Sequence, residues 1–145
     1  MVSANRSGAL TAGPRRVLLV DDDPLVRTTT ASVLGDIGHE VTAVTSASEA
    51  LAVLQSGRIP DLVITDDAMP GMTGTALGRL IRETWPELPV LIVTGYAQGT
   101  ADGPSDLPRL IKPVLQEHLA AQIELLLAPK PTGNIVTLKT GRRVR

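Results

Sequence analysis

Three consecutive carboxylates follow a short apolar run near the start of the chain. Residues 17–20 read VLLV, and Asp21, Asp22 and Asp23 come directly after them. Two like charges about 4 Å apart repel by roughly 4 kcal/mol at an effective dielectric constant near 20. Water, the start of a helix or a bound cation could each offset this repulsion, and the rest of the sequence decides among them.

Polar side chains also stand where other apolar runs end. Asp66 and Asp67 close DLVITDD, Thr94 closes PVLIVT, and Lys112 follows RLI. In an open parallel sheet, ligands bind outside the carboxyl ends of the strands, so these side chains could converge on one pocket. Mg²⁺ prefers oxygen ligands, a carboxylate can attack phosphorus, and a lysine supplies a mobile charge for phosphate oxygens. This set of residues suits a hard cation beside a phosphoryl group.

The elements that must position these side chains are short apolar runs alternating with helical periods. Such alternation is typical of an α/β fold with a doubly wound parallel sheet. The run VLLV has no polar alternation, as expected for a strand that is covered on both faces. We expect strands over residues 17–20, 40–44, 61–65, 89–94 and 109–111, and helices over residues 24–37, 47–56, 75–85 and 114–128.

The remaining segments lack such patterns. Residues 95–107, GYAQGTADGPSDL, contain three glycines and no apolar period, so we expect the fourth helix of the fold to be short or disordered. Residues 1–14 are small and polar and are expected to form a disordered N-terminal tail, and residues 129–145 a basic C-terminal tail. The length of the chain suits one domain, over residues 15–128.

Composition excludes several function classes. The formal net charge of -1 provides no field that would attract nucleic acid or an anionic membrane. Trp85 and Tyr96 are the only aromatic residues, and cysteine is absent, which excludes disulfides and thiolate catalysis. No apolar run approaches the roughly 20 residues that span a bilayer. We therefore expect a cytoplasmic protein without direct contact to nucleic acid or membrane.

The same residues carry a family resemblance. The segments VLLVDDDP, DLVITDDAMPGMTG, VLIVTG and LIKP resemble, in order and at suitable intervals, the signatures of the response regulator receiver domain of bacterial two-component systems. The resemblance implies a flavodoxin-like sheet of five parallel strands in the order 2-1-3-4-5 with helices on both faces. It also implies an acidic pocket for Mg²⁺ or Mn²⁺, and phosphorylation of one aspartate by a sensor histidine kinase or a histidine phosphotransfer protein.

The motif assigns roles to individual residues. The phosphoacceptor of the family stands three residues before the Met of a Met-Pro pair, which makes Asp66 the acceptor, since Met69 precedes Pro70. By the same resemblance, Asp21 and Asp22 bind the metal together with Asp66. The backbone carbonyl of Ala68 completes the metal shell.

Further roles follow from the later motifs. The resemblance implies that Thr94 hydrogen-bonds the phosphoryl oxygen and moves on activation, and that Lys112 pairs with the phosphate. It also suggests a cis peptide bond before Pro113. Asp23 is interpreted as the N-cap of the first helix. Asp67 is interpreted as a solvated residue at the rim, although it could tune the charge of the site or accept phosphate when Asp66 is lost.

The sequence departs from the family at the switch. Receivers commonly carry an aromatic residue three positions before the lysine, where this chain has Arg109, so the familiar aromatic rotation does not carry over. Tyr96, two residues after Thr94, is a possible substitute. We also expect the Gly95–Leu107 segment to become ordered on phosphorylation.

Two other functions are compatible with parts of this pattern. One is a receiver-like binding module that is never phosphorylated. The other is a phosphatase of the haloacid dehalogenase type, with Asp21 as nucleophile and Asp23 as general acid. That family needs an acidic motif after its lysine, but only Glu117 and Glu124 follow Lys112, both within the last expected helix.

The favoured function is a phosphoacceptor that carries a signal rather than a turnover enzyme. It would act as a monomer or weak dimer. Its signal would leave through contact with a downstream protein that the sequence does not identify.

Overall fold

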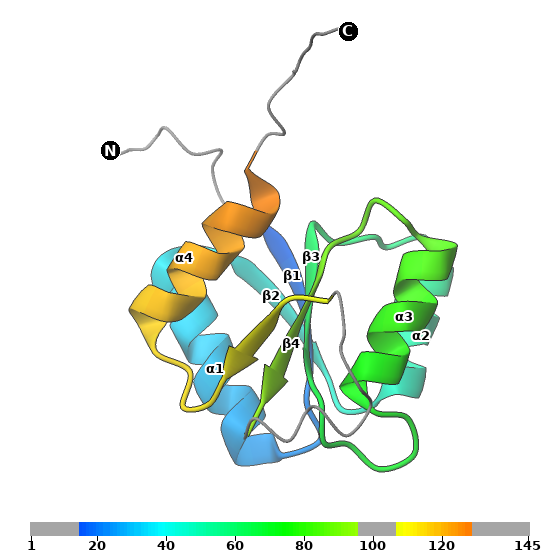
Figure 1. Ribbon diagram of the computed structural model, residues 1–145, viewed down its shortest axis with the longest axis horizontal. Helices are drawn as coiled ribbons and strands as arrows, with labels where there is room; N and C mark the ends of the chain where they lie inside the picture. The colour runs from blue at the N-terminus through cyan, green and yellow to red at the C-terminus, as the bar shows by residue number, and fades with distance from the viewer. Residues whose placement is uncertain (1–14, 96–106, 129–145) are drawn as a thin grey trace, which may run out of the picture.

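The computed structural model describes residues 15–95 and 107–128 of the chain. They form one sheet of five parallel strands in the order β2-β1-β3-β4-β5, with helices on both faces (Figure 1). The strands are β1 (Arg16–Val20), β2 (Glu40–Val44), β3 (Leu62–Asp66), β4 (Val90–Thr94) and β5 (Arg109–Ile111), and the helices are α1 (Pro24–Ile37), α2 (Ala47–Gln55), α3 (Gly74–Thr84) and α4 (Gln116–Leu127). The predicted fold class and strand order are confirmed. Both tails, Tyr96 and most of the Gly95–Leu107 segment lie outside the described residues.

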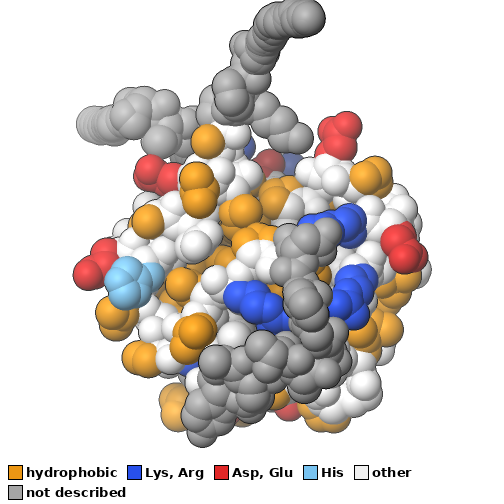
Figure 2. Space-filling view, viewed as in Figure 1, with side chains coloured by type: hydrophobic (Ala, Val, Ile, Leu, Met, Phe, Trp, Pro, Cys, Tyr) orange, Lys and Arg blue, Asp and Glu red, His pale blue; other side chains and the backbone are white. Residues whose placement is uncertain are grey.

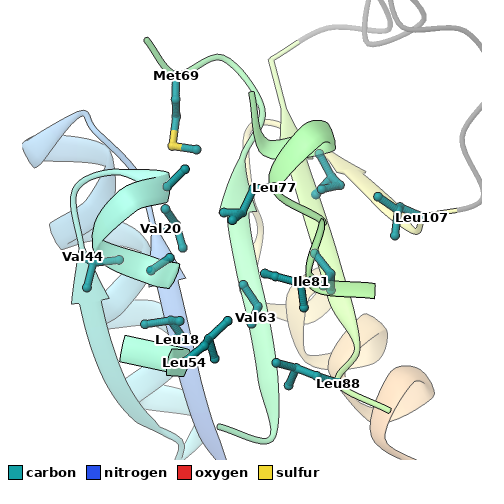
Figure 3. Close-up of a cluster of buried hydrophobic side chains, with 14 residues drawn as sticks. Leu18, Val20, Val44, Leu54, Val63, Met69, Leu77, Ile81, Leu88 and Leu107 are labelled. Carbon is teal, nitrogen blue, oxygen red and sulfur yellow. The ribbon is translucent and has the colours of Figure 1, made fainter. Parts of the chain in front are cut away.

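The sheet is covered on both faces, which explains its continuous apolar strands. Helices α1 and α4 pack on one face, and α2 and α3 on the other (Figure 1). Along β1, Leu18 and Val20 join the core under α2 and α3, while Val17 and Leu19 join the core under α1 and α4. Figure 3 shows the first of these cores, with Met69 at one end of the cluster. Alternate residues of one strand therefore serve two cores, and neither face needs polar residues.

The ends of α1 follow directly from the sequence. The Asp23 carboxylate accepts hydrogen bonds from the N–H groups of Leu25, at 3.0 Å, and Val26, at 3.3 Å, and Pro24 occupies the first turn. Gly38 ends the helix in the left-handed region with a φ of 112°, a conformation that favours glycine. The predicted N-cap role of Asp23 is thus confirmed.

The last helix begins later than expected. The prediction placed its start at Val114, whereas α4 begins at Gln116, after Leu115 in an extended conformation that makes no side-chain capping bond. The Lys112–Pro113 peptide bond is cis, as the resemblance suggested. Among the described residues, the helices are too short or too polar to cross a bilayer.

At Gly74, a helix approaches the polar edge of the sheet closely. A Cβ atom at this position would overlap the carbonyl oxygen of Asp66 and lie 2.9 Å from the Cα atom of Asp67. The N–H of Gly74 donates to the carbonyl of Asp67 at 3.0 Å. The start of α3 thus rests directly on the backbone that carries Asp66.

Replacing Gly74 by alanine should therefore destabilise the protein, by about 1–3 kcal/mol, because the added methyl group meets backbone that cannot move aside easily. The matched control is Gly35→Ala, within α1, where nothing lies within 4 Å of the added atom. This control should be neutral or stabilising by about 0.5–1 kcal/mol. Urea unfolding of the two variants measures both effects, and equal shifts would contradict the packing described here.

Candidate functional site

The topology brings the acidic ends of β1 and β3 together. The two strands are neighbours, with Val20 paired to Thr65, so the residues that follow them share one edge of the sheet. Carboxylate oxygens of Asp21, Asp22 and Asp66 all lie within 4.8 Å of one another. Asp21 and Asp66 are buried, with 4% and 6% of their surface exposed, whereas Asp22 is open to solvent.

The ammonium group of Lys112 lies next to this cluster. The Nζ atom of Lys112, just after β5, lies 2.7 Å from Oδ1 of Asp66. Lys112 is held in place by its own backbone, since its N–H donates to the carbonyl of Thr94 at 2.8 Å. Thr94 is itself buried at the end of β4, between the strands that carry Asp66 and Lys112.

The pKa values of the site reflect this crowding. Burial raises the pKa of Asp21, and the charges of Asp66 and Asp22 raise it further, against the lowering effect of the hydrogen bond from the Asp23 N–H and of the Lys112 charge. Burial alone would lower the pKa of Lys112, but its hydrogen bond and ion pair with Asp66 outweigh this effect, so the pKa lies above its ordinary value. The cluster therefore carries more negative charge than its surroundings neutralise.

The donor set fits a hard divalent cation. Asp21, Asp22 and Asp66 supply carboxylate oxygens, and the exposed side of Asp22 leaves room for the waters that Mg²⁺ retains. The backbone beneath them is fixed: Oδ1 of Asp21 accepts from the Asp23 N–H at 2.9 Å, and the Asp21 carbonyl accepts from Nη1 of Arg27 at 2.9 Å. Arg27, in the first turns of α1, is a support that sequence reasoning did not identify.

The interpretation of Asp67 as a solvated rim residue is wrong. Its Oδ1 atom accepts hydrogen bonds from both the backbone N–H and the hydroxyl of Thr75, each at 2.8 Å. Its Oδ2 atom lies 3.8 Å from Nη1 of Arg109. Asp67 turns toward α3 because consecutive residues at the end of a strand point to opposite sides. The unusual Arg109 was the one signal in the sequence that could have revealed this pairing.

Ala68 and Arg109 differ in their surroundings. Ala68 is exposed and directly follows Asp66 and Asp67 in the chain, next to the acidic cluster. Arg109 occupies the position of the family's aromatic residue, but its side chain contacts Thr75 and Asp67. Tyr96 lies outside the described residues.

Comparisons with known proteins point to one family. The family model for the response regulator receiver domain matches residues 17–104. The response regulator protein FleR of Pseudomonas aeruginosa is 48% identical over 81 residues, which cover 56% of this chain and 17% of FleR. The receiver protein CpdR of Brucella abortus is 33% identical over 117 residues, covering 78% of this chain and 97% of CpdR.

Solved structures show the same fold. The response regulator TrrA of Thermotoga maritima, in complex with Mg²⁺-BeF, is 29% identical and covers 78% of this chain and 99% of its own, with a TM-score of 0.71. A receiver protein of Sinorhizobium medicae is 33% identical, with a TM-score of 0.70 over 82% of this chain. Several curated relatives are longer, and this chain spans 17% of FleR and 51% of the response regulator MprA of Mycolicibacterium vanbaalenii.

The crowding of carboxylates makes a prediction about Asp21→Asn. The amide removes one charge and keeps an oxygen that can accept from the Asp23 N–H, so the metal-free variant should melt a few degrees above the wild type near pH 7. Folding raises the pKa of Asp21, so the folded state binds the proton more tightly than the unfolded state does. The stability that this proton contributes to the wild type is lost as the pH rises through the pKa of the folded state. The difference in melting temperature between the variant and the wild type should therefore be smaller at about pH 4 than near pH 7.

Thermal melts with and without Mg²⁺ measure both effects. The Mg²⁺-dependent rise in melting temperature should be smaller in Asp21→Asn than in the wild type. Asp36→Asn, at an exposed position of α1, is the control and should leave the response to Mg²⁺ unchanged. A metal-free Asp21→Asn protein that melts below the wild type would contradict this account of the cluster.

Proposed function

Because the chain belongs to the response regulator receiver domain family, we propose that Asp66 is the residue that accepts the phosphoryl group in its two-component system. The observation that carries the proposal is the position of the Asp66 carboxylate. It is buried, lies within reach of the Asp21 and Asp22 oxygens, and is 2.7 Å from the Lys112 ammonium. A phosphoryl group on Asp66 would thus be surrounded by charges of the right sign once a cation joins Asp21 and Asp22.

The reaction follows from these positions. An oxygen of the Asp66 carboxylate attacks phosphorus and forms a new O–P bond, while the bond from phosphorus to the donor breaks and the donor keeps its electron pair. Mg²⁺, or Mn²⁺, held by Asp21, Asp22, Asp66 and the Ala68 carbonyl, supplies neutralising charge when bound. Lys112 pairs with one phosphoryl oxygen, and the Thr94 hydroxyl donates to another. Catalysis here is mostly positioning and neutralisation of charge.

We infer from the family that the donor is a phosphohistidine of a sensor histidine kinase or of a phosphotransfer protein, and that the signal passes on by protein contact. The acyl phosphate on Asp66 is labile, and the chain acts as a signalling domain with at most intrinsic autophosphorylation and autodephosphorylation. The phosphatase alternative loses its general acid, because the Asp23 carboxylate caps α1 instead.

Acetyl phosphate with Mg²⁺, followed by intact mass measurement, tests this proposal. The wild type should gain the mass of one phosphoryl group, and Asp66→Asn should gain none, because an amide does not form the acyl phosphate. Asp36→Asn, which removes an exposed carboxylate from α1, should be labelled like the wild type. An unlabelled wild type would favour the binding module that is never phosphorylated, and full labelling of Asp66→Asn would refute the assignment.

A further inference from the structure

The side chain of Arg109 crosses from the edge strand to the start of α3. Arg109 pairs with Ile92 in the sheet, and its Nη2 atom donates to the hydroxyl of Thr75 at 2.9 Å. Its side chain is 22% exposed, and its Nη1 atom is buried without a hydrogen bond to any described residue. A buried guanidinium N–H without a hydrogen-bond partner is costly, so a nearby negative charge is needed to offset it.

The charge that holds Arg109 is the carboxylate of Asp67. The two atoms Nη1 and Oδ2 are 3.8 Å apart, which is long for a hydrogen bond but suits an ion pair. Thr75 connects the two residues a second time, since its hydroxyl accepts from Arg109 and donates to Asp67. Thr75 is fully buried, with 0% of its surface exposed. We call Asp67, Thr75 and Arg109 the Asp67 clasp.

The clasp also fixes the backbone next to Asp66. The N–H of Asp67 donates to the carbonyl of Val93, and its carbonyl accepts from the N–H groups of Met69 and Gly74, each at 3.0 Å. The Asp67 carboxylate in turn satisfies the Thr75 N–H, one of the otherwise unpaired donors at the start of α3. The residue after the phosphoacceptor is therefore anchored to β4, to its own loop and to α3.

The clasp balances charge as well. Within residues 15–95 and 107–128, the acidic cluster of Asp21, Asp22 and Asp66 forms an ion pair with the Lys112 ammonium. A fourth carboxylate one residue from Asp66 would deepen the negative field if it were not paired. Figure 2 shows that, on the face viewed, Lys and Arg side chains gather near the centre and acidic side chains lie toward the periphery.

We propose that Arg109 is a positioning residue that acts through Asp67 on the Asp66 site, by neutralising the adjacent carboxylate so that an anionic phosphoryl donor can approach. At the same time, the hydrogen bonds of Asp67 to Thr75, Val93 and Gly74 hold the backbone that directly follows Asp66. The inference rests on the proposed phosphoacceptor role of Asp66. Arg109, which stands where receivers commonly carry an aromatic residue, would thus favour the approach of the phosphoryl donor.

The decisive variant is Arg109→Gln, studied in the full chain. Without the arginine charge beside the Asp67 carboxylate, the site is more negative and should bind Mg²⁺ about threefold more tightly, as measured by calorimetry. At saturating Mg²⁺, phosphorylation by acetyl phosphate should be about threefold slower, because the donor is an anion. Both differences from the wild type should shrink at high salt, which screens charges but leaves packing unchanged. A clasp that only supports the fold would instead weaken metal binding and phosphorylation together.

The double variant Asp67→Asn/Arg109→Gln tests the same idea by rescue. It removes the unpaired charge and keeps an amide oxygen for the two Thr75 donors, so Mg²⁺ affinity and phosphorylation rate should both return toward the wild type. Arg79→Gln removes the same charge from an exposed position of α3 and should change neither. The inference is overturned if the double variant behaves like Arg109→Gln, or if Arg109→Gln shifts both quantities in the same direction.

These results are separable from a failure of the proposed function. If the wild type takes no phosphoryl group, the function falls, while the calorimetric shift in Mg²⁺ affinity still decides whether Arg109 offsets the Asp67 charge. If the wild type is phosphorylated and Mg²⁺ affinity is unchanged in Arg109→Gln, the function stands and the charge-balancing role falls.

Discussion

Repulsion among buried carboxylates is the interaction on which the site depends. A parallel sheet with β1 next to β3 forces Asp21 and Asp66 to the same edge, and the cores on both faces keep these strands from moving apart. The fold thus holds like charges together, at the expense of stability in the metal-free state. Under the proposed function, a bound divalent cation would relieve this repulsion. The ammonium of Lys112 offsets part of the repulsion among the carboxylates even without a metal.

The fold was predictable because each local signal agreed with the global one. Apolar runs without alternation marked strands buried on both faces, Asp23 and Pro24 marked a helix start, and Gly38 its end. The start of the last helix was less certain, because no capping side chain precedes Gln116 and the apolar residues Val114 and Leu115 continue its pattern. Boundaries without a capping signal are where periodicity misleads.

The sequence predicted which side chains meet at the edge of the sheet, but not how Asp67 is paired. The strand order brings together the side chains that follow the strands, namely Asp21, Asp22, Asp66 and Lys112. Asp67 bonds instead to the start of α3, a contact that depends on the close approach of Gly74 to the sheet. No spacing in the sequence predicts that approach. The sequence alone therefore led to the interpretation of Asp67, next to Asp66, as a solvated residue.

The carboxylates of Asp66 and Asp67, although adjacent in the chain, have different partners. Asp66 keeps its carboxylate available, facing a lysine and two other acids, while the Asp67 carboxylate is occupied by two donors of Thr75 and the charge of Arg109. The alternation of side chains at the end of β3 separates the two by sending them to different sides of the chain. Under the proposed function, this pairing would leave Asp66 as the more available nucleophile of the two. The clasp would then contribute to selecting Asp66 as the phosphoacceptor.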